Sequence, residues 1–269
     1  TLYFILSWGA LTRAGAPPGA PPAEEERDLA NTPKTLARPL AQRVAGLEDL
    51  RAPAGEGPPI PANVIAAAEA ALARGETHYT DRPGIPELRS WVAERLLEKW
   101  NVSVDPSEVT ITCGSTEARY VALTLLAEAG SAVLCPGDSA RIRGALHLLG
   151  ARSVAAIQDD VSLLYLTPDV YRETSIELLQ RAEETDWWIV YDLSFAKTAP
   201  PFHPAQNPKL ARRVVTIDSW SERLAGWRLG WMAGSEMALK LRAGKQAITI
   251  CSTAVSQWAG LEWVTSRMR

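Results

Sequence analysis

From residue 62 onward, apolar segments with helical periodicity alternate with short apolar segments typical of strands. Trp187–Tyr191 is a continuous apolar run, as expected of a strand that is covered on both faces. Gly84-Ile85-Pro86 opens a helix whose apolar positions follow the 3.6-residue period: Leu88, Trp91, Val92, Leu96 and Trp100. The alternation predicts an α/β fold with a mostly parallel mixed sheet and helices on both of its faces.

The same patterns predict the remaining elements of this fold. Helices are expected over Val64–Arg74, Ser115–Glu128, Arg141–Leu149, Ser175–Glu184 and Met237–Ala247. Strands are expected over Glu108–Cys113, Ala132–Cys135, Val154–Ile157, Ser162–Leu166, Val214–Ile217 and Leu229–Ala233.

The beginning of the chain has a different composition. Residues 15–27 combine Pro, Gly and a run of three glutamates, a mixture that cannot bury a core. We therefore expect an N-terminal arm and Pro-rich linker over residues 1–50 and one domain over residues 51–269. The first residues, Leu2–Leu6, are apolar but lack a basic region before them, so a signal peptide is not favoured.

Charge and composition exclude several classes of function. The net charge of −3 in 269 residues gives no basic surface for nucleic acid or for an anionic membrane. No run of about 20 apolar residues exists, so no membrane-spanning helix is expected, and we expect a cytoplasmic protein. The three cysteines are odd in number and unclustered, and the three histidines show no ligand spacing, so no metal site is expected.

The segment Cys113-Gly114-Ser115-Thr116 joins a predicted strand to a predicted helix. The first turn of a helix has free N–H groups and the positive end of the helix dipole, which together favour an anion. Gly114 lets the backbone approach such a ligand closely. The simpler alternative is that Ser115 caps its helix and binds nothing.

A second segment, Ser219–Gly230, follows the predicted strand Val214–Ile217 and contains Ser219-Trp220-Ser221 and Trp227-Arg228-Leu229-Gly230. A third, His78–Arg89, contains Tyr79, Gly84 and Leu88-Arg89. In this order and spacing, residues from about 55 to 265 resemble the large domain of class I/II aminotransferases, the fold-type I enzymes that depend on pyridoxal phosphate (PLP).

The resemblance implies a cofactor site. Gly114, Ser115, Thr116, Ser219, Ser221 and Arg228 match residues that hold the PLP phosphate. Tyr79 matches a tyrosine that reaches the phosphate of the neighbouring subunit, which implies a homodimer. Asp192 matches the aspartate that pairs with the pyridine nitrogen and makes the ring an electron sink. The expected ligand is PLP, bound non-covalently, or another phosphorylated small molecule.

Several positions depart from the family pattern. Glu222 stands where the family has the lysine that forms the Schiff base, and a carboxylate cannot form an imine. Phe195 replaces a tyrosine that bonds the PLP O3′, and Ser139 replaces the aromatic residue that stacks on the ring. The Asn-Pro loop after Leu166 is missing, and the C-terminal small domain has no counterpart in this sequence. The resemblance thus implies a degenerate member of the family.

Three functions remain open from the sequence. The first is an aminotransferase-like protein that keeps the phosphate site but is impaired or inactive as a transaminase, and that binds PLP or another phosphorylated ligand or serves as an interaction module. The second is an active PLP enzyme that uses another lysine, Lys197 or Lys245. The third is a structural dimer without a ligand.

Overall fold

A computed structural model describes residues 59–266, apart from residues 171, 195, 197, 198, 221 and 235. For residues 172, 173 and 222 it describes the backbone only. The expected N-terminal arm over residues 1–50 lies outside the described residues. The division of the chain at residue 50 therefore stays a prediction.

One sheet of seven strands forms the centre of the fold, in the order β1-β7-β6-β5-β4-β2-β3. The strands are β1 Val109–Thr112, β2 Ala132–Leu134, β3 Arg152–Val154, β4 Val161–Leu166, β5 Trp188–Asp192, β6 Val214–Ser219 and β7 Gly230–Gly234. Neighbours from β3 to β6 are parallel, and β7 lies antiparallel between β6 and β1. The predicted mostly parallel mixed sheet is confirmed.

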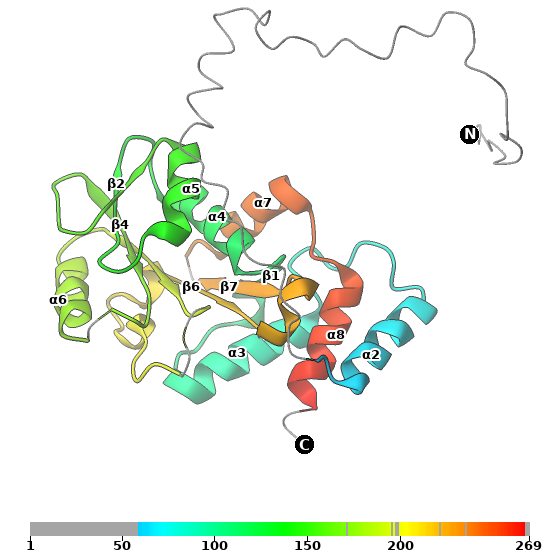
Figure 1. Cartoon of the computed structure of the whole chain (residues 1–269). Helices are drawn as coiled ribbons and strands as arrows, with labels where there is room; N and C mark the ends of the chain where they lie inside the picture. The colour runs from blue at the N-terminus through cyan, green and yellow to red at the C-terminus, as the bar shows by residue number, and fades with distance from the viewer. Residues whose placement is uncertain are drawn as a thin grey trace, which may run out of the picture. The chain divides into compact units, whose positions relative to one another are not determined.

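Helices cover both faces of this sheet (Figure 1). On one face lie α4 Ser115–Leu126, α5 Ala140–Leu149 and α7 Ala238–Thr249. On the other face lie α2 Ala62–Ala73, α3 Pro86–Trp100, α6 Arg172–Glu183 and α8 Ala254–Thr265. Short 3-10 helices occupy Pro106–Glu108, Pro204–Gln206, Ala211–Arg213 and Glu222–Trp227.

Two hydrophobic cores result, one on each face, because alternate residues of a strand point to opposite sides. In β5, Ile189 and Tyr191 belong to the core that includes residues of α3 and α8, whereas Val190 belongs to the core that includes residues of α4 and α5. Every residue of β5 from Ile189 to Asp192 is buried. The prediction that Trp187–Tyr191 is covered on both faces is therefore confirmed.

Two elements differ from the sequence-based prediction. The third strand was expected at Val154–Ile157 but spans Arg152–Val154, because it is an edge strand whose limits are set by pairing with β2. Ile157 lies beyond it and is 48% exposed. Helix α8 was not predicted: it is buried on most of its surface, so it lacks the contrast between an apolar and a polar side.

The sheet topology gathers several chain segments at one edge. Strands β4, β5 and β6 are parallel, and β1 runs in their direction because β7 is antiparallel to both β1 and β6. The C-terminal ends of β1, β5 and β6 therefore lie together, beside the start of β7. Ligands of open α/β sheets bind at such an edge.

Candidate functional site

A cavity of about 870 Å³ lies at this edge of the sheet. Its walls come from the chain that follows β1, β5 and β6, from α3, from the starts of α4 and α5, and from the chain before β7. The lining includes three arginines, one carboxylate, three serines and a set of apolar and aromatic residues: Arg95, Arg141, Arg228, Asp218, Ser115, Ser194, Ser219, Trp100, Trp220, Trp231, Leu193 and Leu229. The cavity is thus cationic and hydroxyl-rich with aromatic walls.

The turn between β1 and α4 depends on two glycines. Gly114 has a φ of +84°, and a β-carbon there would lie 2.5 Å from Nη2 of Arg228. A β-carbon on Gly230 would lie 2.5 Å from the carbonyl carbon of Gly114 and 2.6 Å from the Ser115 nitrogen. Gly230 requires glycine because a β-carbon would meet backbone atoms, and Gly114 is favoured as glycine by its positive φ. Gly114 and Ser115 line the cavity, so the start of α4 faces it.

Arg228 flanks this turn. Its guanidinium donates to the carbonyl oxygens of Ala225 at 3.2 Å and Cys113 at 3.4 Å, and its side chain is exposed along the cavity wall. Its backbone φ is +53°, in the left-handed region, which costs a non-glycine residue about 1 kcal/mol. The two bonds hold a bidentate donor beside the first turn of α4, an arrangement suited to an anion with several oxygens.

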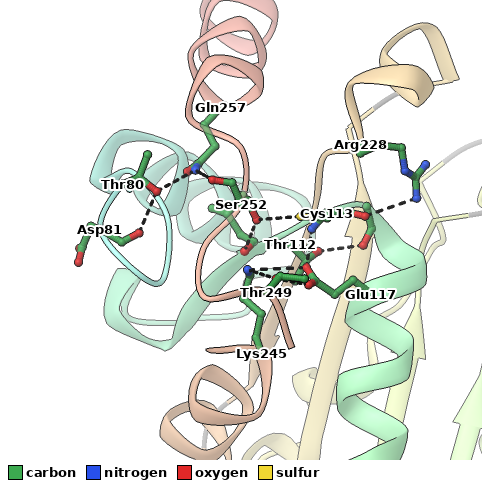
Figure 2. Close-up of polar contacts among 12 residues, drawn as sticks. Thr80, Asp81, Thr112, Cys113, Glu117, Arg228, Lys245, Thr249, Ser252 and Gln257 are labelled. Atoms are coloured by element: carbon green, nitrogen blue, oxygen red, sulfur yellow. Dashed lines mark hydrogen bonds and ion pairs between the residues drawn. The ribbon is translucent and has the colours of Figure 1, made fainter. Parts of the chain in front are cut away.

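A buried ion pair supports the turn from behind (Figure 2). Glu117 accepts the Cys113 N–H at 2.6 Å through Oε2 and a bond from the Thr249 hydroxyl through Oε1. Lys245 is fully buried, with Nζ 3.8 Å from Glu117 Oε2 and 2.9 Å from Thr249 Oγ1. The amine of Lys245 therefore takes part in the ion pair and hydrogen bonds that join α7 to α4, and it does not line the cavity.

Ser252 and Gln257 connect the other side of β1 to the turn around Thr80 (Figure 2). Ser252 donates to the Ile111 carbonyl at 3.0 Å. Gln257 donates from Nε2 to the Ser252 carbonyl at 2.9 Å and to the Thr80 hydroxyl at 3.1 Å. Beside this network, Tyr79 and Ser252 line a second cavity, of about 660 Å³, and the Tyr79 side chain is 79% exposed.

Asp192 ends β5 as a fully buried carboxylate. Its Oδ2 accepts a bond from Arg119 Nε at 2.6 Å and one from the Tyr165 hydroxyl. Its Oδ1 accepts the Ser194 N–H at 3.0 Å and the Ser194 hydroxyl at 2.6 Å. Burial, and then the charge of Asp192, raise the pKa of Tyr165 far above its usual value, so the hydroxyl stays protonated and donates. Removing one partner of such a buried pair costs about 3–5 kcal/mol.

Asp218 is the one carboxylate among the residues that line the first cavity. Burial raises its pKa to about 7, and the charge of Asp192 adds to the shift. The Ser219 N–H, which donates to Asp218 Oδ1 at 2.7 Å, and the charge of Arg95 act in the opposite direction. Asp218 therefore changes its charge near neutral pH at the wall of the cavity.

The structure brings together four of the residues that the resemblance singled out: Gly114, Ser115, Ser219 and Arg228 line one cavity. Asp192 lies behind the lining, Thr116 is exposed outside it, and Tyr79 lies at the second cavity. Ser139 precedes α5, whose Arg141 lines the first cavity. Ser221, Phe195, Lys197 and the side chain of Glu222 lie outside the described residues.

Sequence reasoning missed Arg119, Tyr165, Ser194 and Asp218. One signal for Arg119 was available: it stands between apolar positions on the core side of a predicted helix. A charged residue at a buried position needs a buried partner of opposite charge. No sequence signal identified that partner, since Arg119 and Asp192 are 73 residues apart.

Among residues 59–266, with the gaps given above, no group of three or more His, Cys, Asp or Glu side chains is placed to hold a metal ion. In the same part of the chain, no helix has the length and apolar character to cross a membrane.

Comparison with known proteins points to one family. Residues 49–138 match the model of the family "Aminotransferase class I and II". A probable aspartate aminotransferase of Methanocaldococcus jannaschii is 27% identical over 234 residues, which is 75% of this chain and 62% of that protein. The aspartate/prephenate aminotransferase of Thermus thermophilus is 26% identical over 267 residues, covering 86% of this chain and 68% of that protein.

Solved structures agree with the sequence comparison. A tetra mutant of the Thermus thermophilus aspartate aminotransferase superposes with a TM-score of 0.73 at 24% identity, covering 84% of this chain and 71% of that one. The chain spans 62% and 60% of the length of two curated relatives that it matches. The matched motifs, the sheet topology and these comparisons together show that the chain has the fold of fold-type I enzymes and is similar in sequence to class I and II aminotransferases.

Proposed function

We propose that this chain binds PLP or another phosphorylated small molecule through its phosphate group, without a covalent bond, and does not catalyse transamination. The phosphate side of the cavity supports the first part. Gly114 and Ser115 present the open first turn of α4, and Arg228 and Ser219 line the same wall. Backbone N–H groups at a helix start and a guanidinium are the partners that a phosphate dianion prefers.

The ring side of the cavity does not fit PLP as a catalytic cofactor. A protonated pyridine nitrogen needs a carboxylate with a free acceptor position. Asp192 occupies the family position for this role, yet its oxygens already accept four hydrogen bonds from Arg119, Tyr165 and Ser194. This contrast between an open phosphate side and a saturated Asp192 is the observation that carries the proposal.

The small number of lysines that could form a Schiff base supports the absence of transamination. Glu222 stands at the position of the Schiff-base lysine, and the chain has only six lysines. Lys245, one of the two alternatives, is fully buried in an ion pair with Glu117 behind the turn. Lys197 is the remaining alternative and lies outside the described residues. A covalent role for Lys245 would require breaking the Glu117 ion pair.

The proposal includes a homodimer. Tyr79 is 79% exposed and lies at the second cavity, away from the residues that line the first cavity. A tyrosine in that position is available to a neighbouring subunit, as the resemblance implies. Light scattering of the purified full chain tests the dimer, and a monomer at micromolar concentration contradicts it.

The test is a titration of the purified full chain with PLP, pyridoxal and inorganic phosphate, followed by borohydride reduction and peptide mapping. PLP is expected to bind about tenfold or more tightly than pyridoxal, with phosphate competing, because the phosphate supplies most of the binding energy. Arg228→Met is expected to abolish this preference. Arg181→Met is the matched control, since Arg181, on α6, forms an exposed salt bridge with Glu184.

Each outcome of the titration has a defined meaning. Release of all bound PLP on dialysis, with no borohydride-stable adduct on any lysine, supports the proposal. A stable adduct on Lys197 or Lys245 overturns the non-covalent part and favours an active enzyme. No binding of PLP or phosphate overturns the anion site and leaves a structural protein.

A further inference from the structure

Arg119 donates a hydrogen bond to Asp192, the carboxylate that would otherwise be available to a ligand. An ionised carboxylate offers about four lone-pair positions for hydrogen bonds. Arg119 and Tyr165 bond Oδ2, and the N–H and hydroxyl of Ser194 bond Oδ1, so all positions are taken by groups of the chain itself. Arg119 is 6% exposed and Asp192 is fully buried, so water does not weaken this pair.

Arg119 lies behind two serines of the cavity floor. Its Nη2 donates to the hydroxyl of Ser115 at 3.0 Å and to the hydroxyl of Ser194 at 3.3 Å. Ser115 and Ser194 line the cavity, whereas neither Arg119 nor Asp192 does. A ligand at this floor therefore meets two hydroxyls with a guanidinium directly behind them, and the Asp192 carboxylate is not available to it.

We infer that Arg119 determines the ligand class of the cavity: a phosphorylated small molecule whose opposite end carries no positive charge, so that a protonated ring nitrogen brings no gain in affinity. The inference rests on the proposed function, because it assumes that the phosphate binds beside Ser115 and Arg228. A pyridinium would have to displace a buried cation from Asp192 and would lie next to that cation. A neutral ring or chain avoids both costs.

The aromatic and apolar part of the remaining wall suits an uncharged group. Trp100, Trp231 and Leu229 line the cavity and are themselves buried. Trp220 also lines it and is held in place by stacking on Trp91, with ring centroids 5.9 Å apart. Such surfaces bury an uncharged aromatic or aliphatic group by the hydrophobic effect and by ring packing.

Asp218 is the carboxylate that the test must separate from Asp192, because it lines the cavity. It lies next to Ser219, and its Oδ1 already accepts the Ser219 N–H. Replacing Asp218 with Asn removes its charge and keeps its size. A preference for a pyridinium that came from Asp218 would disappear in this variant.

The experiment compares two probes by calorimetry: PLP and its carbocyclic analogue, in which a C–H group replaces the ring nitrogen. Both carry the same phosphate, so their affinity ratio reports the ring nitrogen alone. In the wild-type chain and in Asp218→Asn, the two affinities are expected to agree within about threefold. In Arg119→Leu, which leaves Asp192 with a free acceptor position, PLP is expected to bind about tenfold more tightly than the analogue.

Two further variants control for this comparison. Tyr165→Phe removes one bond to Asp192 but leaves Arg119 in place, so the ratio is expected to stay near one. Arg119→Leu/Asp192→Asn removes the freed carboxylate, so the preference for PLP is expected to be lost again. Circular dichroism and thermal unfolding check that each variant folds, and Arg119→Met, whose side chain also cannot donate to Asp192, replaces Arg119→Leu if the latter does not fold.

The failures of the two proposals are distinguishable. A wild-type chain that binds both probes but prefers PLP by about tenfold overturns the role of Arg119 and leaves the phosphate site intact. An unchanged ratio in a folded Arg119→Leu variant overturns it as well. A wild-type chain that binds neither probe overturns the proposed function, and the inference with it.

Discussion

A β-carbon added to Gly114 would lie 2.5 Å from Nη2 of Arg228. The close approach lets the guanidinium reach the Cys113 carbonyl at 3.4 Å while it borders the first turn of α4. Gly114 also has a φ of +84°, a conformation that L-residues rarely adopt. The two residues therefore form one surface, which we propose binds an anion, and a change at either alters the other.

Gly114→Ala is expected to weaken the binding of PLP and of inorganic phosphate by about tenfold or more, because Arg228 must move and the turn must change its backbone. Calorimetric titration measures both affinities. Gly226→Ala is the matched control, because a β-carbon at Gly226 meets no atom within 4 Å. Equal affinity in Gly114→Ala and the wild type would show that the ligand does not use this turn.

Lys245→Met is expected to destabilise the protein by about 3 kcal/mol, because it leaves the Glu117 carboxylate in the interior without its cation. Lys245 is fully buried, whereas the Glu117 side chain is 8% exposed. Urea unfolding measures the loss. Lys240→Met, at an exposed position of the same helix, is expected to change the stability by less than about 0.5 kcal/mol.

The double variant Lys245→Met/Glu117→Gln sharpens this prediction. Removing both charges is expected to restore part of the stability, since no unpaired charge remains. The amide oxygen that Glu117→Gln introduces would still accept the Cys113 N–H. Additive losses in the double variant would mean that the two side chains do not interact across their 3.8 Å separation.

Asp218 is expected to make anion binding depend on pH around neutrality. Its pKa of about 7 means that the carboxyl is neutral below that value and negative above it. We expect the ratio of two phosphate affinities, that of the wild type over that of Asp218→Asn, to fall as the pH rises through 7. The ionisation of phosphate itself affects both proteins equally and cancels in the ratio. A ratio that is constant between one unit below and one unit above neutrality would contradict the prediction.

His203 is expected to make folding weaker in mild acid. Burial lowers its pKa from 6.5 to about 3, so the imidazole is neutral in the folded state while the unfolded chain binds a proton below 6.5. Its contribution to stability is complete above pH 6.5 and is lost as the pH falls toward 3, by up to about 1.4 kcal/mol per pH unit.

The comparison with His203→Gln isolates this effect. The raised pKa of Asp218 has the opposite slope, because its folded form holds a proton between pH 3.8 and 7 that the unfolded form releases. That contribution is common to both proteins and cancels in the difference. The gap in unfolding free energy between wild type and variant is expected to shrink as the pH falls below 6.5. A gap that stays constant down to pH 4.5 would refute a buried neutral His203.

Local pattern in the sequence determined most of the fold. The apolar run Trp187–Tyr191 and the periodic helix after Pro86 predict a sheet covered on both faces, and the structure has that arrangement. Helix α8 escaped prediction because its small and apolar residues surround it on most sides. Strand β3 was misplaced because an edge strand is defined by its one neighbour, β2.

The sequence by itself determined the residues of the proposed phosphate side, because a glycine turn before a helix and an arginine before a strand are local features. Only the tertiary structure decided the ring side. Arg119 and Asp192 belong to α4 and β5, and whether the carboxylate faces a ligand or a guanidinium depends on how the helix packs on the sheet. The buried pair forms because neither charge is satisfied alone in the interior, a condition that no single segment of the sequence reveals.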